Sequence, residues 1–528
     1  MGSLLKSLAT VSGLTMLSRV FGFLRQLILA GVIGASGTPV ADAFWAAFRL
    51  PNMFRRLLAE GAFQAAFVPL FQNHESHGGV AHAKDFAEDI LAWMVVILTA
   101  LTALVMIFTP TFMSLLTSGF RDDPERFELS VLYARIMFPY LGCMSIVGIF
   151  GGMLNAVHRF AAAAAAPLLL NVALIIGVLF YARADVEVTG QAAAVAVLIS
   201  GFLQLGALVW GAARSQLLLR LRTPRLSRYS RRMVTLGAPG FIAASALQVN
   251  AIIGTNIASR QDGAVSWLIY ADQLYQLPLS IIGIALGVVL MPAIGRAVKS
   301  GDEERARATL EQGFLTAMFF AMPAAVGIVM LGSFISEALF QDLAGFATQL
   351  IGAGGSAFND TDVIMVGSAL FIFGFGLPAY VLQKVFAAAF FAREDTQTPM
   401  RYAITAIVIN AVISVALFPT IGFLSVPTGT VIAAWTEVAL LSTTLRRRNI
   451  LRLYHLLRRL LAIVGASTLL GIALHYLLQI REPLEAMVWG QSWIVLFAIA
   501  VLAVPAYGLV SIALGVITSA DIRRTVRG

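Results

Sequence analysis

Seven cationic side chains interrupt stretches of this sequence that are otherwise apolar enough to cross a membrane. They are Arg19, Arg25, Arg49, Arg55, Arg56, Arg135 and Lys384. A charge at the centre of a bilayer costs roughly 2.5–3.5 kcal/mol on insertion scales, so such a residue normally faces a wet interior and serves a function. Arginine predominates here, and its guanidinium group binds phosphate oxygens through paired hydrogen bonds. The pattern predicts a cationic cavity and an anionic substrate.

Helical spacing gathers these residues into two polar stripes. At about 100° per residue, one face of a first helix holds Ser18, Arg19, Gly22, Arg25 and Gln26. A similar arc of a second helix holds Asp42, Arg49, Asn52, Arg56 and Glu60, with Arg55 just beyond its edge. Stripes on neighbouring helices could line one cavity. That cavity stays cationic, because the two carboxylates cannot neutralise all the arginines.

A purely structural role for the same residues is the main alternative. The arginines could pair with Asp42, Glu60 and helix carbonyls and so lock the bundle. Asp42 could cap the start of its own helix, and Glu60 and Lys384 could each be half of a buried ion pair. Other polar groups are expected to lie in solvated loops: His74, His77 and His82, the pair Asp122 and Asp123, and the pair Glu303 and Glu304.

Composition identifies the elements that must position these side chains. Of the 528 residues, 59% are hydrophobic and 12% are charged, whereas a soluble domain carries about 25% charged residues. Stretches long enough to span a bilayer recur along the whole chain. We predict an all-α polytopic membrane protein whose fourteen spans lie near 8–35, 41–72, 86–117, 129–157, 162–182, 188–213, 233–258, 265–295, 308–335, 364–392, 400–420, 425–445, 455–478 and 487–517.

The basic residues give this arrangement an orientation. With a cytoplasmic N-terminus, 25 of the 37 lysines and arginines fall on the cytoplasmic side and 5 on the outer side. Positive charge marks the cytoplasmic side of membrane proteins, so both termini are predicted to be cytoplasmic. Basic segments at 214–232 and 446–459 divide the helices into six, six and two. The predicted parts are 1–232, 233–448 and 449–528.

The two predicted six-helix halves show a faint internal similarity. Phe48-Arg49-Leu50-Pro51 in the second helix corresponds to Tyr275-Gln276-Leu277-Pro278 in the eighth. Both halves start on the same side of the membrane, because six helices separate them. The repeat is therefore predicted to be parallel, as in transporters with two lobes around a central cavity.

Several chemistries lack their sequence signatures. We find no Walker-type phosphate loop, no HExxH helix and no nucleophile elbow. The single cysteine, Cys143, excludes an intramolecular disulfide and a cysteine metal cluster. We expect a protein that is not an enzyme and has no cofactor. Any transport would then be driven by an ion gradient, the membrane potential, a partner or consumption of the substrate.

The motifs around the two stripes resemble those of one family. They are Ser18-Arg19-Val20-Phe21-Gly22-Phe23-Leu24-Arg25, Ala41-Asp42-Ala43-Phe44, Phe48-Arg49-Leu50-Pro51-Asn52, Arg55-Arg56-Leu57 and Ala59-Glu60-Gly61. In these motifs the chain resembles the MurJ (MviN) lipid II flippases of the multidrug/oligosaccharidyl-lipid/polysaccharide (MOP) exporter superfamily. The resemblance implies fourteen helices, with two six-helix lobes in a V around a cationic cavity. It also implies a groove for the lipid tail at the last two helices.

The resemblance further implies roles for individual residues. The family's cavity arginines correspond to Arg19, Arg25 and Arg55, its later cavity lysine to Lys384, and its acidic residues to Asp42 and Glu60. Ser18 and Ser266 match cavity serines, and Arg49 and Asn52 belong to the same motifs. One departure is Gln273, which stands where the family has a fourth functional arginine.

The expected activity is movement of lipid II from the cytoplasmic to the periplasmic leaflet of the inner membrane by alternating access. Lipid II, membrane lipids and the cell-wall synthesis machinery are the expected partners, and nucleic acid is not. Two alternatives stay open: a flippase for another lipid-linked oligosaccharide, and a membrane scaffold of the same fold that transports nothing.

Overall fold

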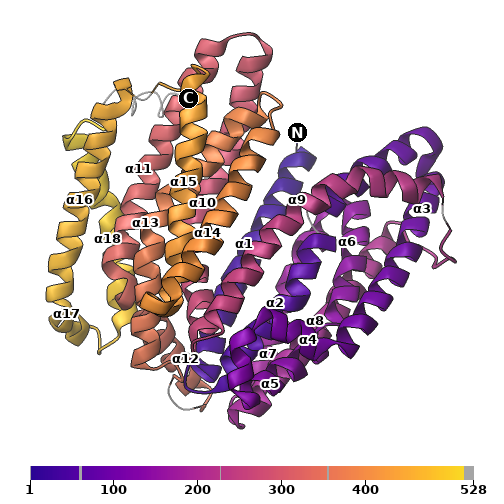
Figure 1. The fold of residues 1–528 in the computed structure, drawn as a ribbon, viewed down its shortest axis with the longest axis horizontal. Helices are drawn as coiled ribbons and strands as arrows, with labels where there is room; N and C mark the ends of the chain where they lie inside the picture. The colour runs from indigo at the N-terminus through magenta and orange to yellow at the C-terminus, as the bar shows by residue number, and fades with distance from the viewer. Residues whose placement is uncertain (1, 59–61, 226, 354–355, 453, 517–528) are drawn as a thin grey trace. The chain divides into compact units, whose positions relative to one another are not determined.

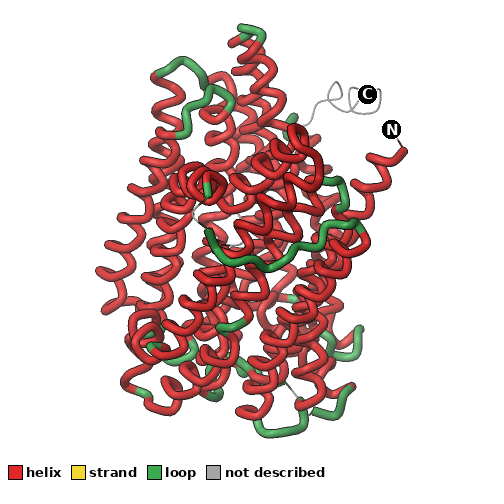
Figure 2. The backbone as a smooth tube through the Cα atoms, turned by 90° about the vertical axis from the view of Figure 1, so that its right-hand side faces the viewer, coloured by secondary structure: helices red, strands yellow, loops and turns green. Residues whose placement is uncertain are grey.

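The described part of the chain consists of helices and the loops that join them. The computed structural model describes residues 2–58, 62–225, 227–353, 356–452 and 454–516, and these ranges contain no strand (Figure 2). Helices cover most of each of the fourteen predicted stretches. The all-α fold class is therefore confirmed. Glu60, one of the predicted site residues, lies outside the described residues.

The number of membrane spans depends on how charged helices are counted. Ten stretches of the described residues are long and apolar enough to cross a membrane, and two of them, Phe63–Ile107 and Gln397–Arg447, are 45 and 51 residues long. Helix α2 (Pro39–Leu58) is not one of the ten, because Asp42, Arg49, Arg55 and Arg56 interrupt its 20 residues. The count of fourteen stays a prediction.

The chain divides into two compact units, and the first comprises Met1–Ser266 together with Ala344–Phe358. Besides α2 and the start of α10 (Ala264–Lys299), its helices are α1 (Gly2–Ile33), α3 (Ala62–Ile107), α4 (Thr109–Leu116), α5 (Pro124–Met137), α6 (Tyr140–Ala156), α7 (Phe160–Tyr181), α8 (Val186–Arg214), α9 (Arg228–Ala258) and α12 (Ala344–Leu350). In this unit α1 packs on α7, α2 on α5, and α3 on α6 and α9 (Figure 1). Fully buried aromatic rings fill the space between them, among them Phe44, Phe67, Phe86 and Tyr133.

Residues 344–358 join this first unit although they lie far along the chain, between helices of the second. Helix α12 packs against the end of α1, and the Ala357 amide donates to the Gly31 carbonyl oxygen over 2.8 Å. A Cβ atom on Gly31 would lie 2.9 Å from Thr348 Cγ2. Only glycine lets the two helices approach this closely, and the hydropathy pattern carries no sign of the contact.

The segment around the three clustered histidines is helical, so the prediction of a loop there was wrong. Helix α3 runs through it and bends at Gly79, whose φ is 72°. The His74 ring stacks on Phe86 with the ring centroids 4.8 Å apart and meets Tyr229 edge-on. Among the described residues, no group of His, Cys, Asp and Glu could hold a metal ion.

The second unit comprises Trp267–Leu343 and Asn359–Gly528. Besides most of α10, its helices are α11 (Glu303–Ser336), α13 (Asp360–Phe391), α14 (Gln397–Ile421), α15 (Ser425–Arg447), α16 (Leu457–Gln479), α17 (Arg481–Met487) and α18 (Ser492–Ala513), with a π-helical turn at Glu337–Leu343. Helices α10, α11, α13 and α15 enclose an apolar core that includes Phe314 and Phe386. Helix α16 packs on α11 and on α18 (Figure 1).

Two further expectations bear on this unit. Glu303 and Glu304 lie in the first turn of α11, not in a loop as predicted, and the Asp302 side chain caps that helix. Acidic side chains are favourable there because the amino end of a helix is electropositive. The division into 1–232, 233–448 and 449–528 stays a prediction.

Candidate anion-binding site

The polar face of α1 is tied to α7 by one amide side chain. Arg25 Nη1 donates to Asn171 Oδ1 over 3.0 Å, and Asn171 Nδ2 donates to the Ser18 carbonyl oxygen over 2.9 Å. Asn171 is only 6% exposed. Its amide therefore brings together two predicted site residues and sets the direction of the Arg25 guanidinium. Asn171 was not among the predicted site residues.

Two arginines of α2 also have polar partners without charge. Arg49 Nη1 donates to the Thr255 hydroxyl group on α9. Arg55 Nε donates to Asn52 Oδ1 over 2.9 Å, one helical turn away. Hydrogen bonds to neutral oxygens fix the direction of a guanidinium group. The described contacts of Arg25, Arg49 and Arg55 therefore orient these side chains for a ligand.

The remaining cations of the two stripes are more open. Arg19 and Arg56 are exposed, as is Arg135 on α5. Helix α1 packs mainly against α7, whereas α2 packs mainly against α5. The two stripes are thus held by different neighbours, and the shared cavity stays a prediction.

Asp42 caps the start of α10, whereas a cap of its own helix, α2, was considered from the sequence. Helix α2 begins at Pro39, so Asp42 lies inside its first turn. The buried carboxylate accepts hydrogen bonds from the Gly263 amide (2.8 Å), the Ser266 amide (2.9 Å) and the Ser266 hydroxyl group (2.7 Å). These are donors at the start of α10, where amides lack partners within the helix. The structure therefore brings the predicted residues Asp42 and Ser266 into direct contact.

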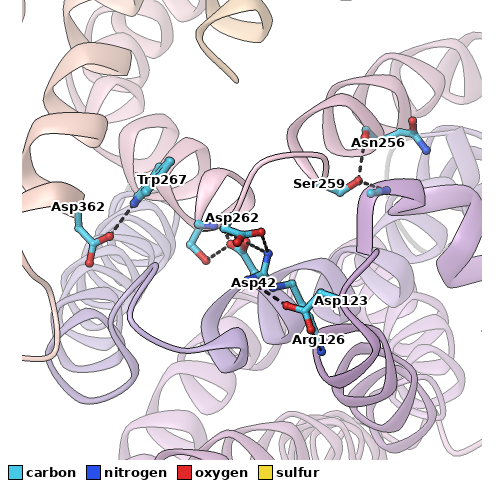
Figure 3. A network of polar contacts seen from close by, with 11 residues as sticks. Asp42, Asp123, Arg126, Asn256, Ser259, Asp262, Trp267 and Asp362 are labelled. Carbon is cyan, nitrogen blue, oxygen red and sulfur yellow. Dashed lines mark hydrogen bonds and ion pairs between the residues drawn. The ribbon is translucent and has the colours of Figure 1, made fainter. Parts of the chain in front are cut away.

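The cation beside Asp42 is Arg126 on α5, which was not among the predicted site residues. Figure 3 shows its side chain among the carboxylates of Asp262, Asp123 and Asp42, at 2.5, 3.3 and 3.9 Å. Arg126 is 6% exposed, although the predicted topology placed it in an outer loop. Asp123 also accepts from the Arg126 amide over 3.2 Å and caps α5, so this carboxylate lies in a loop as predicted but is partly buried and paired. One signal was available: Arg126 is one of the few basic residues on the predicted outer side.

The predicted residue Lys384 lies in the second unit, on α13. Its side chain is exposed, and it forms no ion pair with any residue in the described ranges, so these give no support to a buried pair. Lys384 extends over Gly283 of α10, where a Cβ atom would lie 2.7 Å from the lysine Nζ. Glycine at this position leaves room for the ammonium group. Gln273, which replaces the expected arginine, is half-buried on α10.

Comparison with known proteins gives matches over most of the chain. The model of the family described as "Lipid II flippase MurJ" matches residues 29–490. A probable lipid II flippase MurJ of Rhizobium tropici is 37% identical over 534 residues, which cover 99% of this chain and 97% of that protein. The lipid II flippase MurJ of Burkholderia cenocepacia is 33% identical over 519 residues, with 94% and 96% covered.

Solved structures agree at the level of the fold. A lipid II flippase MurJ in an inward closed conformation matches with a TM-score of 0.78 at 21% identity, over 97% of this chain and 99% of that one. An inward-facing multidrug resistance MATE family transporter of the MOP superfamily matches with a TM-score of 0.66 at 14% identity, over 83% and 97%. The long family-model match and the 37% identity over almost the whole length decide the question. The chain belongs to the MurJ family of lipid II flippases, as its motifs indicated.

Proposed function

We propose that this chain moves lipid II from the cytoplasmic to the periplasmic leaflet of the inner membrane by alternating access. Membership of the MurJ family supports the substrate. The observation that carries the proposal for this chain is the pair of guanidinium groups, Arg25 and Arg55, each oriented by a neutral amide on its helix or a neighbouring one. A pyrophosphate group is the part of the substrate that such groups bind best.

The predicted residues divide into three roles in this proposal. Arg19, Arg25 and Arg55 hold the pyrophosphate, and Arg49 and Lys384 are the further cations that bind substrate. Ser18 and Asn52 orient or supplement the arginines. Asp42 and Ser266 act at the start of α10, where they favour one conformation over another, and Glu60 belongs to the substrate-binding residues. Lys384 compensates for the charge that Gln273 lacks.

The arrangement in the membrane follows from charge and from family membership. Both termini face the cytoplasm, in agreement with the excess of basic residues on that side. Helices α16 and α18 hold the lipid tail. No ATP is hydrolysed by this chain, and an ion gradient or the membrane potential drives transport. Cell-wall synthesis proteins receive the substrate at the outer face.

Complementation of a bacterial strain depleted of its own lipid II flippase tests the proposal. The chain should restore growth and make lipid II accessible at the outer face. Arg25→Ala should abolish rescue at an unchanged membrane level, whereas Arg401→Ala, at an exposed arginine of α14, should rescue fully. Full rescue by Arg25→Ala would remove the arginine from the anion clamp.

The Gln273→Arg variant separates the remaining readings. Rescue by the unchanged chain means that three cavity arginines suffice. Rescue by the variant alone identifies the chain as a specialised member of its family. If neither rescues at normal membrane levels, another lipid-linked oligosaccharide or a scaffold role takes the place of lipid II transport.

A further inference from the structure

A second cationic site lies in the first unit, away from the residues discussed above. A cavity of about 720 Å³ opens where α1, the junction of α6 and α7, and the end of α8 meet. Ligand sites in proteins commonly have volumes of about 300–1,000 Å³. Leu14, Leu154 and Ala165 form apolar walls, Arg159 and Arg214 supply positive charge, and the described lining residues include no Asp or Glu. This combination suits an amphiphilic anion.

Arg214 places the charge at the level of lipid headgroups. Its guanidinium carbon lies 4.0 Å from the centroid of the Trp210 ring, in a cation–π contact. Trp210 also lines the cavity and is 59% exposed. Tryptophan side chains gather at the membrane–water interface. The stacked pair therefore marks the depth at which a phosphate would lie.

Arg159 adds a second cation together with backbone donors. It is the residue before α7, and its own side chain makes no capping hydrogen bond to that helix. The first amides of a helix lack partners within it and lie at its electropositive end. α7 is 22 residues long and therefore carries a full helix dipole. The amides of its first turn add to the attraction of Arg159 for an anion.

The apolar wall is closed by small residues. A Cβ atom on Gly211 of α8 would lie 3.2 Å from Ala162 Cβ and 3.5 Å from Leu154 Cδ1. The three helices therefore meet closely at this point, and the apolar surface continues from the cations along Leu14 and Ala165. An acyl chain fits such a surface, whereas a soluble anion would leave it exposed to water.

We propose that this cavity binds an anionic phospholipid, with its phosphate between Arg159 and Arg214 and an acyl chain along Leu14 and Ala165. Basic pockets between membrane helices on the cytoplasmic side are suited to anionic headgroups. Under the orientation proposed above, the lipid comes from the cytoplasmic leaflet. The proposal goes beyond lipid II transport and uses none of the arginines assigned to it.

Binding of radiolabelled phosphatidylglycerol to the purified full-length chain in detergent tests the site. The chain should prefer phosphatidylglycerol to phosphatidylcholine with the same acyl chains. The double variant Arg159→Gln, Arg214→Gln should lower the affinity by about tenfold or more, because two charge-assisted contacts are lost. The matched control Arg401→Gln, Arg447→Gln removes two exposed arginines of the second unit and should bind like the unchanged chain.

A second variant separates the cavity from its charge. Ala165→Leu keeps both guanidinium groups and narrows the apolar wall, and it should also weaken binding. Equal binding of the two phospholipids would overturn the proposal, as would equal losses in the double variant and its control. Displacement of the lipid by millimolar inorganic phosphate would show a simple phosphate site and overturn the assignment to a lipid.

Discussion

At the scale of single residues, Arg126 is the shared counter-ion of three carboxylates from different parts of the first unit. Asp42 comes from α2, Asp123 from the start of α5, and Asp262 from the turn between α9 and α10. Asp42 in turn holds the first amides of α10. A buried carboxylate without its cation is costly. Arg126 therefore stabilises the junction of three helices through Asp42.

Replacing this cation should destabilise the protein strongly. We expect Arg126→Met to lower the free energy of unfolding by about 3 kcal/mol, because breaking a buried charge pair leaves the partner charge uncompensated. The thermal stability of the detergent-solubilised chain, followed by size-exclusion chromatography, measures the effect. Arg121→Met, at an exposed arginine nearby, should have little effect. Equal stability of the two variants would show that Asp42 does not need Arg126.

A substitution of Asn171 tests whether the direction of the Arg25 guanidinium group matters in addition to its charge. Asn171→Leu removes the hydrogen bonds to Arg25 and to the Ser18 carbonyl oxygen, but it leaves every arginine in place. We expect complementation to be lost or strongly reduced while the membrane level and thermal stability change little. Asn171→Gln keeps an amide and should restore part of the activity. Unimpaired growth with Asn171→Leu would mean that Arg25 needs no fixed direction.

At the scale of elements, the two basic connecting segments are held in the same way in each unit. Glu88 on α3 accepts from the Arg220 amide over 2.9 Å and pairs with Arg222 at 2.6 Å. Glu311 on α11 accepts from the Arg452 amide over 2.9 Å and lies 3.0 Å from His455 Nε2. Both glutamates are buried, and the helix after each segment packs on the helix that carries the glutamate. This shared arrangement supports the parallel repeat more directly than the short sequence similarities do.

Further contacts hold the first basic segment against α3. Arg222 pairs with Asp85 as well as Glu88. The Arg225 carbonyl oxygen accepts a hydrogen bond from Trp93 Nε1 over 2.8 Å. The segment is therefore fastened to α3.

Limited proteolysis tests whether Glu88 holds the first basic segment against α3. Arg220, Arg222 and Arg225 are exposed, so trypsin can reach them once the backbone is free to enter its active site. We expect Glu88→Ala to speed cleavage at these arginines by about tenfold, since a loss of roughly 1.4 kcal/mol in local stability corresponds to that factor. Glu311→Ala should do the same at Arg452, while Glu304→Ala, at a side chain that is 88% exposed, should leave both rates unchanged. Unaltered cleavage in Glu88→Ala would contradict the fastening.

The turn between α13 and α14 gives the second unit an acid-sensitive contact. The Asp395 carboxylate accepts from the Thr398 amide (3.0 Å) and hydroxyl group (2.8 Å) and pairs with Arg448 at 2.7 Å. Burial alone would raise the pKa of Asp395, but these donors outweigh it and hold the pKa below its ordinary value of 3.8. Because the pKa is lowered in the folded state, the contact stabilises the fold at pH values above the ordinary pKa. The stability is lost as the pH falls through the lower, folded value.

Thermal unfolding of Asp395→Asn at several pH values tests the direction of this pH dependence. The variant should be less stable than the unchanged chain at pH 7, and the difference should shrink below about pH 4. Asp122→Asn, at an exposed carboxylate, serves as the control and should give a small difference at both ends of the range. The difference in thermal stability between Asp395→Asn and the unchanged chain could instead stay constant down to about pH 3. That result would show that Asp395 is not the acid-sensitive group.

At the scale of the whole molecule, apolar stretches of bilayer length were enough to locate the helices. The same principle could not show the bend of α3 at Gly79, which depends on a positive φ, or the packing of residues 344–358 on α1, which depends on close approach of backbones. For the candidate site, the arginine stripes were visible in the spacing of charges. Their partners Asn171 and Thr255 were not, since a hydrogen bond between residues far apart in the chain leaves no local pattern. The contacts of Arg126 with Asp42 and Asp262 also join residues far apart in the chain, and its place on the predicted outer side was the one signal for it.

Orientation in the membrane is the property of the whole chain that charge alone predicts, and cysteine labelling tests it. Cys143 is the single cysteine and is buried, so Cys143→Ala gives a background for new cysteines. Because basic segments stay in the cytoplasm, Arg225→Cys should react with a membrane-impermeant maleimide only in inverted vesicles. Arg260→Cys, at an exposed site on the predicted outer side, should react in intact spheroplasts. The opposite pattern would reverse the topology. It would also place the arginines of the proposed phospholipid site in the outer leaflet, so the direction of transport and the source of that lipid depend on the same result.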